Sequence, residues 1–87
     1  MKINGEFIIR EVAGEYVLVP VGETALHFNG IISLNEVSAL VWKGLQDGKN
    51  RDQLLKSILA EFEVSSEQAG ADLDEFLDTM RKNKLLA

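Results

Sequence analysis

Residues 30–45 read Gly-Ile-Ile-Ser-Leu-Asn-Glu-Val-Ser-Ala-Leu-Val-Trp-Lys-Gly-Leu, and the spacing of the apolar residues changes partway along this stretch. Its first five residues are rich in branched apolar side chains, which predicts a short strand over Gly30–Leu34. From there onward the apolar residues recur at a helical period and share one face: Leu34, Val37, Leu40, Val41 and Leu45. Either Ser33 or Asn35 can cap the start of this helix, and Asp47-Gly48 ends it. The stretch therefore predicts a strand that leads directly into a helix.

Two segments before this stretch have the pattern of a β-hairpin. They are Phe7–Val12 and Tyr16–Pro20, both rich in β-branched and aromatic residues, with Ala13-Gly14-Glu15 between them. Pro20 ends the pairing because it has no amide hydrogen to donate. Apolar residues fall on both faces of these strands, so part of the sheet is expected to be covered on more than one side. Together with Gly30–Leu34 the hairpin predicts a three-stranded antiparallel meander, while Ala25–Asn29 fits neither a strand nor a helix clearly.

Two more helices are predicted after Gly48. Asn50, with Gln53 three residues on, caps the first of them, whose apolar face is Leu54, Leu55, Ile58, Leu59 and Phe62. Ser65 with Gln68 repeats this start signal for the second, whose apolar stripe is Ala69, Leu73, Phe76, Leu77 and Met80. Basic residues close its last turn, as the helix dipole prefers, and Asn83 is a candidate left-handed terminator.

The length of 87 residues allows one domain, and we expect it to span residues 1–87. The predicted order is three strands followed by three helices, with short loops and no linker or internal repeat. This order defines an α+β fold in which the helices pack on each other and on one face of a three-stranded antiparallel sheet. The last two helices, placed beside the strands, have the proportions of a winged helix-turn-helix.

Composition excludes several classes of function. The absence of cysteine removes thiolate catalysis, iron–sulfur ligation and thiolate zinc sites, and the single histidine, His27, cannot build a multi-histidine site. No stretch matches a nucleotide-binding glycine motif, and the acids near Asp72 follow a helical spacing rather than that of a calcium loop. Trp42 lies at the edge of an apolar stripe, which is typical of a core residue. We therefore expect no catalytic residues, no metal and no cofactor.

The apolar runs and the net charge bear on the expected location of the protein and on its possible binding partners. The longest apolar runs, Tyr16–Val21 and Ala39–Trp42, are far shorter than the roughly 18 residues of a membrane-spanning helix. The first residues lack the apolar stretch and cleavage site of a secretory signal, so a cytoplasmic location is expected. The net charge of −5 repels nucleic acids and anionic lipids. Residues 50–75 hold two basic against seven acidic residues, which disfavours DNA binding by the helix pair.

Three runs resemble a known family, and they occur in its order. Ile32-Ser33-Leu34-Asn35-Glu36, then Ala39-Leu40-Val41-Trp42 and then Leu45-Gln46-Asp47-Gly48 are similar to the Leu-Asn pair, the apolar-Trp pair and the Asp-Gly turn of the PqqD-like family. Asp72-Leu73 with Phe76-Leu77 resembles the motif on that family's third helix. The resemblance runs from the strand at Phe7 almost to the end of the chain.

The resemblance implies a winged-helix-like precursor-peptide recognition element. Such a protein has no enzymatic activity: it binds the leader of a ribosomally made peptide and presents it to a modifying enzyme, in many cases a radical S-adenosylmethionine (radical SAM) protein. An unpaired edge on the third strand can take the leader as a fourth strand, with the last helix as the other wall. The implied peptide-binding residues are Gly30, Ile31, Ile32, Ser33, Leu34, Ala69, Asp72, Leu73 and Phe76.

Several alternatives remain open at this point. At helical spacing Leu73 and Phe76 are also typical core residues. The acids Asp72 and Glu75 can pair with basic groups on either the peptide or the enzyme. A winged-helix DNA-binding regulator, which predicts salt-sensitive binding to duplex DNA, is the second hypothesis. A purely structural subunit, which binds the enzyme but no leader, is the third.

Overall fold

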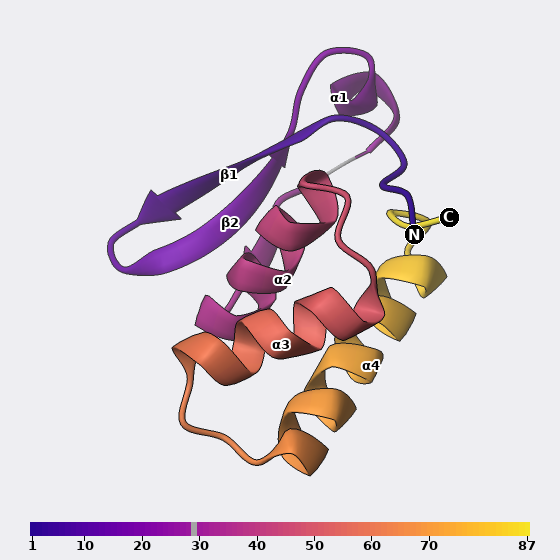
Figure 1. Ribbon diagram of the computed structural model, residues 1–87. Coiled ribbons are helices and arrows are strands. Elements are labelled where there is room, and N and C mark those ends of the chain that lie inside the picture. The colour runs from indigo at the N-terminus through magenta and orange to yellow at the C-terminus, as the bar shows by residue number, and fades with distance from the viewer. Residues whose placement is uncertain (29) are drawn as a thin grey trace.

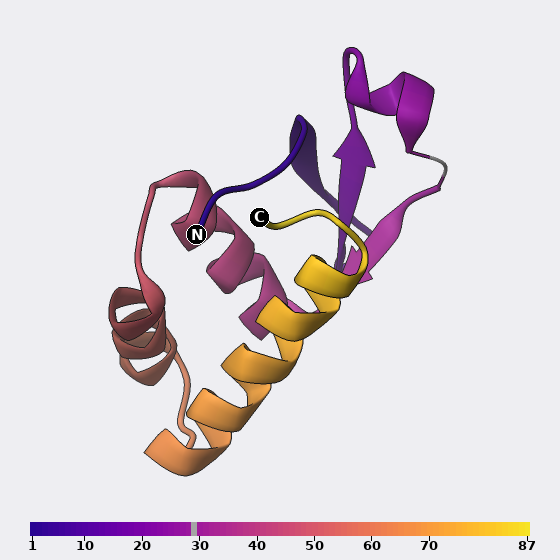
Figure 2. The same ribbon diagram turned by 90° about the vertical axis from the view of Figure 1, so that its right-hand side faces the viewer.

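The computed structural model describes residues 1–28 and 30–87 and shows an α+β fold (Figure 1). The elements in chain order are β1 (Phe7–Val12), β2 (Glu15–Pro20), α1 (Thr24–His27), β3 (Ile32–Leu34), α2 (Glu36–Gln46), α3 (Arg51–Glu61) and α4 (Ser66–Lys82). The strands form one antiparallel sheet in the order β1-β2-β3, as predicted. Helices α2 and α4 lie on one side of this sheet, and α3 packs on both of them (Figure 2). In the described ranges, no helix has both the length and the apolar character needed to span a lipid bilayer.

The predicted hairpin is confirmed, with a shorter turn than the sequence indicated. Val12 pairs with Glu15, so the turn consists of Ala13 and Gly14 alone. Both turn residues have positive φ angles, 52° and 82°, which is the geometry of a type I′ turn. This turn matches the right-handed twist of the two strands, and glycine adopts its second position without strain.

The region before β3 differs from the prediction in two ways. Thr24–His27 forms a one-turn helix, α1, so residues 1–28 and 30–87 contain four helices rather than the three predicted. This helix occupies most of the ambiguous segment; Asn29 lies outside the described residues. β3 is shorter than the predicted Gly30–Leu34, because Gly30 has a φ of 107° and leaves the extended conformation, and pairing with β2 begins at Ile32.

The predicted helix starts are confirmed, and the structure decides between the two caps proposed for α2. The side chain of Asn35, not that of Ser33, accepts a hydrogen bond from the Ser38 amide at 2.8 Å. Asn50 and Gln53 form a reciprocal capping box at the start of α3, with both bonds at 2.9 Å. The Ser65 hydroxyl accepts from the Gln68 amide at the start of α4. These local signals fix where each helix begins.

The predicted terminator of α4 is wrong by one residue. Asn83 keeps a φ of −90°, and its side-chain amide donates to the carbonyl of Thr79 at 2.8 Å. Lys84 takes the left-handed conformation instead, with a φ of 62°. The following amide, that of Leu85, then bonds the Met80 carbonyl at 2.9 Å, which closes a Schellman motif.

The core forms where α2 meets the sheet and α4. Trp42 is fully buried, which confirms its interpretation as a core residue, and its ring meets Phe7 edge to face with centroids 5.7 Å apart. Leu18 from β2 and Leu73 from α4 are also fully buried in this cluster. Gly44 lets α3 approach α2 closely, because a β-carbon there would collide with the side chain of Leu54. The buried residues thus hold α2 between the sheet and the other two long helices.

An exposed ion pair joins the start of α3 to α4 and predicts a pH effect. Arg51 donates to both carboxylate oxygens of Asp74, at 2.7 and 2.9 Å, and this hydrogen bonding lowers the pKa of Asp74 below its ordinary value of 3.8. The stabilisation is therefore present above pH 3.8 and is lost as the pH falls through the lowered pKa. We expect Asp74→Asn to lower the melting temperature slightly at pH 7, because the pair is exposed, and by less at pH values where wild-type Asp74 is protonated. Thermal melts of both proteins across this range check the prediction.

Candidate functional site

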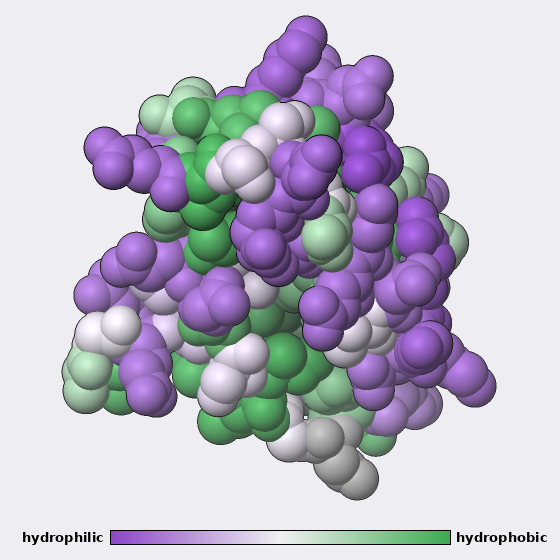
Figure 3. Space-filling model, turned by 90° about the horizontal axis from the view of Figure 1, so that it is seen from below, coloured by the Kyte–Doolittle hydropathy of each residue, from purple (hydrophilic) through white to green (hydrophobic). Residues whose placement is uncertain are grey.

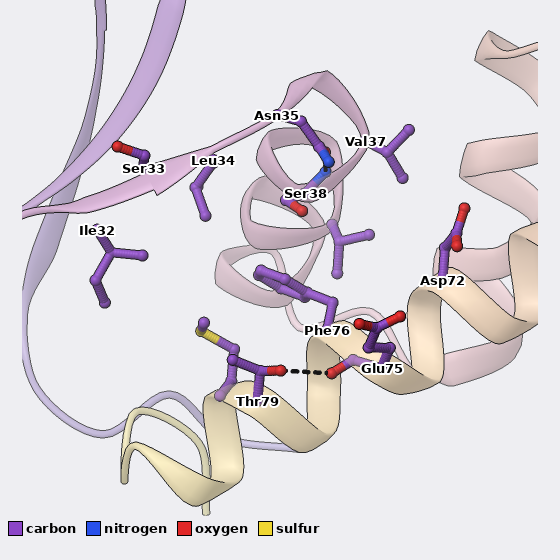
Figure 4. Close-up of a pocket in the computed structure, with 12 residues that line it drawn as sticks. Ile32, Ser33, Leu34, Asn35, Val37, Ser38, Asp72, Glu75, Phe76 and Thr79 are labelled. Carbon is purple, nitrogen blue, oxygen red and sulfur yellow. Dashed lines mark hydrogen bonds between the residues drawn. The ribbon is translucent and has the colours of Figure 1, made fainter.

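A groove of about 360 Å³ lies between β3 and α4, with the first turn of α2 at its end (Figure 4). Ile32 and Leu34 point from β3 toward α4, while Ser33 points away from that helix. Phe76 extends from α4 toward them and is half-buried. The walls therefore carry apolar side chains from two elements that are far apart in the sequence.

The sheet edge beside this groove is open. β3 pairs with β2 on one side, and on its other side no strand among residues 1–28 and 30–87 pairs with it. An unpaired strand edge presents a row of backbone donors and acceptors to an incoming chain. The structure thus combines an open edge with an apolar groove next to it, which is the geometry that strand addition requires.

The structure brings five of the nine predicted peptide-binding residues to the groove. They are Ile32, Ser33, Leu34, Asp72 and Phe76. Ala69 and Leu73 are 1% and 0% exposed and lie in the core behind the groove. Gly30 and Ile31 precede β3, are exposed and do not line the groove.

Sequence reasoning missed the contribution of α2. Asn35, Val37, Ser38 and Val41 line the groove, as do Thr79 and Met80 one turn beyond Phe76 on α4. The sequence does contain one signal that predicts a place for the α2 residues at the groove. A strand that leads directly into a capped helix must place the first turn of this helix at the end of the strand. Glu75, considered before only for its charge, also lines the groove.

The charge along the groove is negative. Its lining residues include two carboxylates, Asp72 and Glu75, both exposed on α4, and no lysine or arginine. Asp72 accepts a hydrogen bond from the Gln68 side chain at 2.8 Å, and the Thr79 hydroxyl donates to the backbone carbonyl of Glu75 at 2.9 Å. An occupant with basic residues would be favoured next to this wall.

A second, shallower hollow continues the groove toward the hairpin turn. It shares Ser33, Leu34 and Asn35 with the groove and is also lined by Gly14, Glu15, Tyr16 and Glu36. Seen from below, apolar side chains gather at the lower centre of the molecule, and hydrophilic side chains border them (Figure 3). A chain lying in the groove can therefore continue past the end of β3.

The polar side chains of the groove are of few kinds. Its lining holds serine, threonine and carboxylates but no histidine, lysine or cysteine to act as a nucleophile or as its partner base. Across the part of the chain that the structure describes, no three His, Asp or Glu side chains gather as a metal site requires. The groove can bind an extended chain by backbone pairing and apolar contact.

Two solved structures share this fold over nearly the whole chain. One is TbiB1 in complex with the TbiA(beta) leader peptide: the identity is 26%, the TM-score 0.75, and the match covers 99% of this chain and 94% of that one. The other is a lasso peptide synthetase B1 complexed with the leader peptide, at 19% identity and a TM-score of 0.74, covering 99% and 95% of the two chains. No curated protein sequence matches this chain. The family model for coenzyme PQQ synthesis protein D (PqqD) matches residues 8–86. The chain therefore belongs to the PqqD family.

Proposed function

We propose that this protein is a non-enzymatic peptide chaperone that binds the leader of a ribosomally made precursor peptide as a fourth strand on β3. The observation that carries the proposal is the open edge of β3 beside the apolar groove. TbiB1 shares this fold at 26% identity, and its complex with a leader peptide supports the proposal. The residues proposed to bind are those of the groove, Ile32–Leu34 on one wall and Asp72 and Phe76 on the other.

The energetics require side-chain anchors in addition to backbone pairing. Ordering each peptide residue costs about 1–2 kcal/mol, and a hydrogen bond returns about 0.5–1.5 kcal/mol, so pairing alone roughly breaks even. Each buried Leu, Ile or Phe adds about 1.5–3 kcal/mol. Three residues of β3 span about 10 Å, which places one or two alternate peptide side chains in the groove. Contacts in the neighbouring hollow then bring affinity toward the micromolar range, about −8 kcal/mol.

The second partner that we propose is the enzyme that modifies the peptide, a radical SAM protein or another maturation enzyme. A protein that binds a leader without changing it is useful only if it presents the rest of the peptide to a catalyst. We place this step in the cytoplasm, where a newly made peptide leaves the ribosome.

An NMR titration tests the proposed function. The full chain, labelled with ¹⁵N, is mixed with synthetic leader peptides, chosen by reading the open reading frames that neighbour its gene. We expect amide shifts in residues 30–34, in the first turn of α2 and in residues 66–77 of α4. Unchanged amides in these segments would contradict the proposal. Salt-sensitive binding to duplex DNA in place of the leader would instead favour the regulator hypothesis.

Replacing Phe76 by alanine is expected to weaken leader binding about tenfold, because one aromatic wall of the groove is lost. Phe62→Ala is the matched control: Phe62 is also half-buried against the core, but it does not line the groove. Both variants should lose comparable stability, and Phe62→Ala should keep wild-type affinity. Fluorescence polarisation with a labelled leader measures the affinities. Equal losses of leader affinity in the two variants would indicate that the peptide does not bind in the groove.

A further inference from the structure

The sheet face turned away from α2 and α4 carries an apolar surface that the proposed peptide site does not use. We call it the outer sheet face; its apolar residues are Ile8, Val12, Val17, Val19 and Ile31. Val12 and Ile31 are 58% and 64% exposed, and the other three are half-buried. Among the described residues these five neither belong to the hydrophobic core nor pack against it. The alternate residues of the same strands, such as Ile9 and Ile32, do pack against it.

The sequence predicts that part of the sheet is covered on both faces, and the outer sheet face bears on this prediction. Apolar residues on both faces of β1 and β2 indicate a sheet covered on two sides, whereas in the described part of the chain the long helices α2 and α4 lie on the same side of it (Figure 2). Ile8 stands opposite Val19 in the strand register, so the apolar side chains are neighbours across the sheet. Exposed apolar side chains that gather on one face can form a contact surface for another molecule.

The charges on the outer sheet face indicate what that molecule is. Arg10, opposite Val17, and Glu15, opposite Val12, are the charged side chains that strand alternation adds to this face. They have opposite signs, both are exposed, and neither forms an ion pair within the described ranges. The face is therefore neutral in a protein whose net charge is −5, so two copies repel each other least when these faces meet.

We propose that the outer sheet face binds a second copy of this chain in a two-fold symmetric dimer. In a two-fold symmetric dimer every contact between different residues occurs twice, and we expect Arg10 of each copy to meet Glu15 of its partner, with both pairs flanking apolar contacts. The groove faces the other side of the sheet, and both grooves stay open in the dimer. The proposal does not depend on the peptide-binding function.

The size of this face limits the strength of the dimer. Six-residue strands are about 20 Å long and lie about 4.8 Å apart, so the face is roughly 20 by 12 Å. This is less than the roughly 800 Å² per partner of a standard interface. We therefore expect a dimer that dissociates at about 0.1–1 mM.

A charge-swap cycle on the full chain tests the proposal. Sedimentation velocity from about 10 μM to about 2 mM gives the dimer dissociation constant of wild type, Arg10→Glu, Glu15→Arg and the double variant. Each single reversal places like charges opposite each other twice and should raise the constant about tenfold or more, whereas the double variant should return to within about threefold of wild type. The altered side chains are exposed, and circular dichroism confirms that each variant is folded.

Isosteric Val17→Thr adds a check on the apolar part and should weaken the dimer about fivefold. A wild-type protein that stays monomeric at about 2 mM, or a dimer whose constant does not respond to the single reversals, would overturn the proposal. If the wild-type protein stays monomeric, the outer sheet face would instead be a candidate contact surface for a different protein. Leader binding should be the same in wild type and in Arg10→Glu, because Arg10 lines neither the groove nor the neighbouring hollow, so this test and that of the peptide site fail separately.

Discussion

Methylating backbone nitrogens of the leader one at a time is expected to weaken binding by about 100-fold at alternate positions and by less than about threefold at the positions between them. In a strand paired along β3, every second amide points at β3 and its neighbours point at solvent. A methyl group on an inward amide removes a hydrogen bond worth about 1 kcal/mol and also holds apart two strands that must lie about 4.8 Å from each other. Isothermal titration calorimetry with the methylated peptides measures the losses.

The alternation is the decisive part of this result. β3 has three residues, so the large losses should be confined to about two peptide positions. The outward positions are the built-in control, because methylation there changes the conformational freedom of the peptide in the same way. A loss of similar size at consecutive positions would indicate a helix lying in the groove and would contradict strand addition.

Replacing Trp42 by alanine is expected to lower the free energy of unfolding by about 3–5 kcal/mol. The indole is fully buried between β1 and the helices and touches Phe7, which in turn meets Phe28 edge to face at 5.5 Å. Its removal leaves a cavity that the surrounding core fills only in part. Because domains of this size are stable by about 5–15 kcal/mol, much of the population should unfold at moderate urea concentration. Urea titrations followed by circular dichroism measure the change.

Trp42→Phe is the matched variant for this experiment. The indole nitrogen of Trp42 is buried and has no hydrogen-bond partner among the described residues. Phenylalanine removes this unpaired donor and keeps most of the apolar contact, so the loss should be well under half of that for alanine. Losses of equal size in the two variants would contradict the cavity explanation, because phenylalanine keeps most of the filled volume.

Much of the groove was predictable because its elements are defined locally. The period change after Leu34 and the caps at Asn50 and Ser65 depend on residues within one or two helical turns. The hairpin itself follows from a glycine placed between two apolar runs, although its turn is one residue shorter than the sequence indicated. Such signals act through neighbouring residues, so the order of strands and helices can be obtained without knowledge of the packing.

Which side chains line the groove was not predictable in this way. Leu73 and Phe76 lie on the same apolar stripe of α4, and the sequence treats them alike. Packing against α2 and the sheet buries Leu73 fully and leaves Phe76 half-buried in the groove wall. Likewise, Ser33 and Asn35 are both good caps, and the pairing of Ser33 with Val17 leaves the cap to Asn35.

The sequence by itself determined the types of the long elements, their order and the starts of the long helices, because hydrogen bonds and side-chain period within each segment specify them. The tertiary structure decided which apolar residues are core and which face the groove, where β3 begins, and that no long helix among the described residues lies on the outer sheet face. These features depend on how far apart separate elements come to rest, and that distance is set by the volumes of side chains from all of them together.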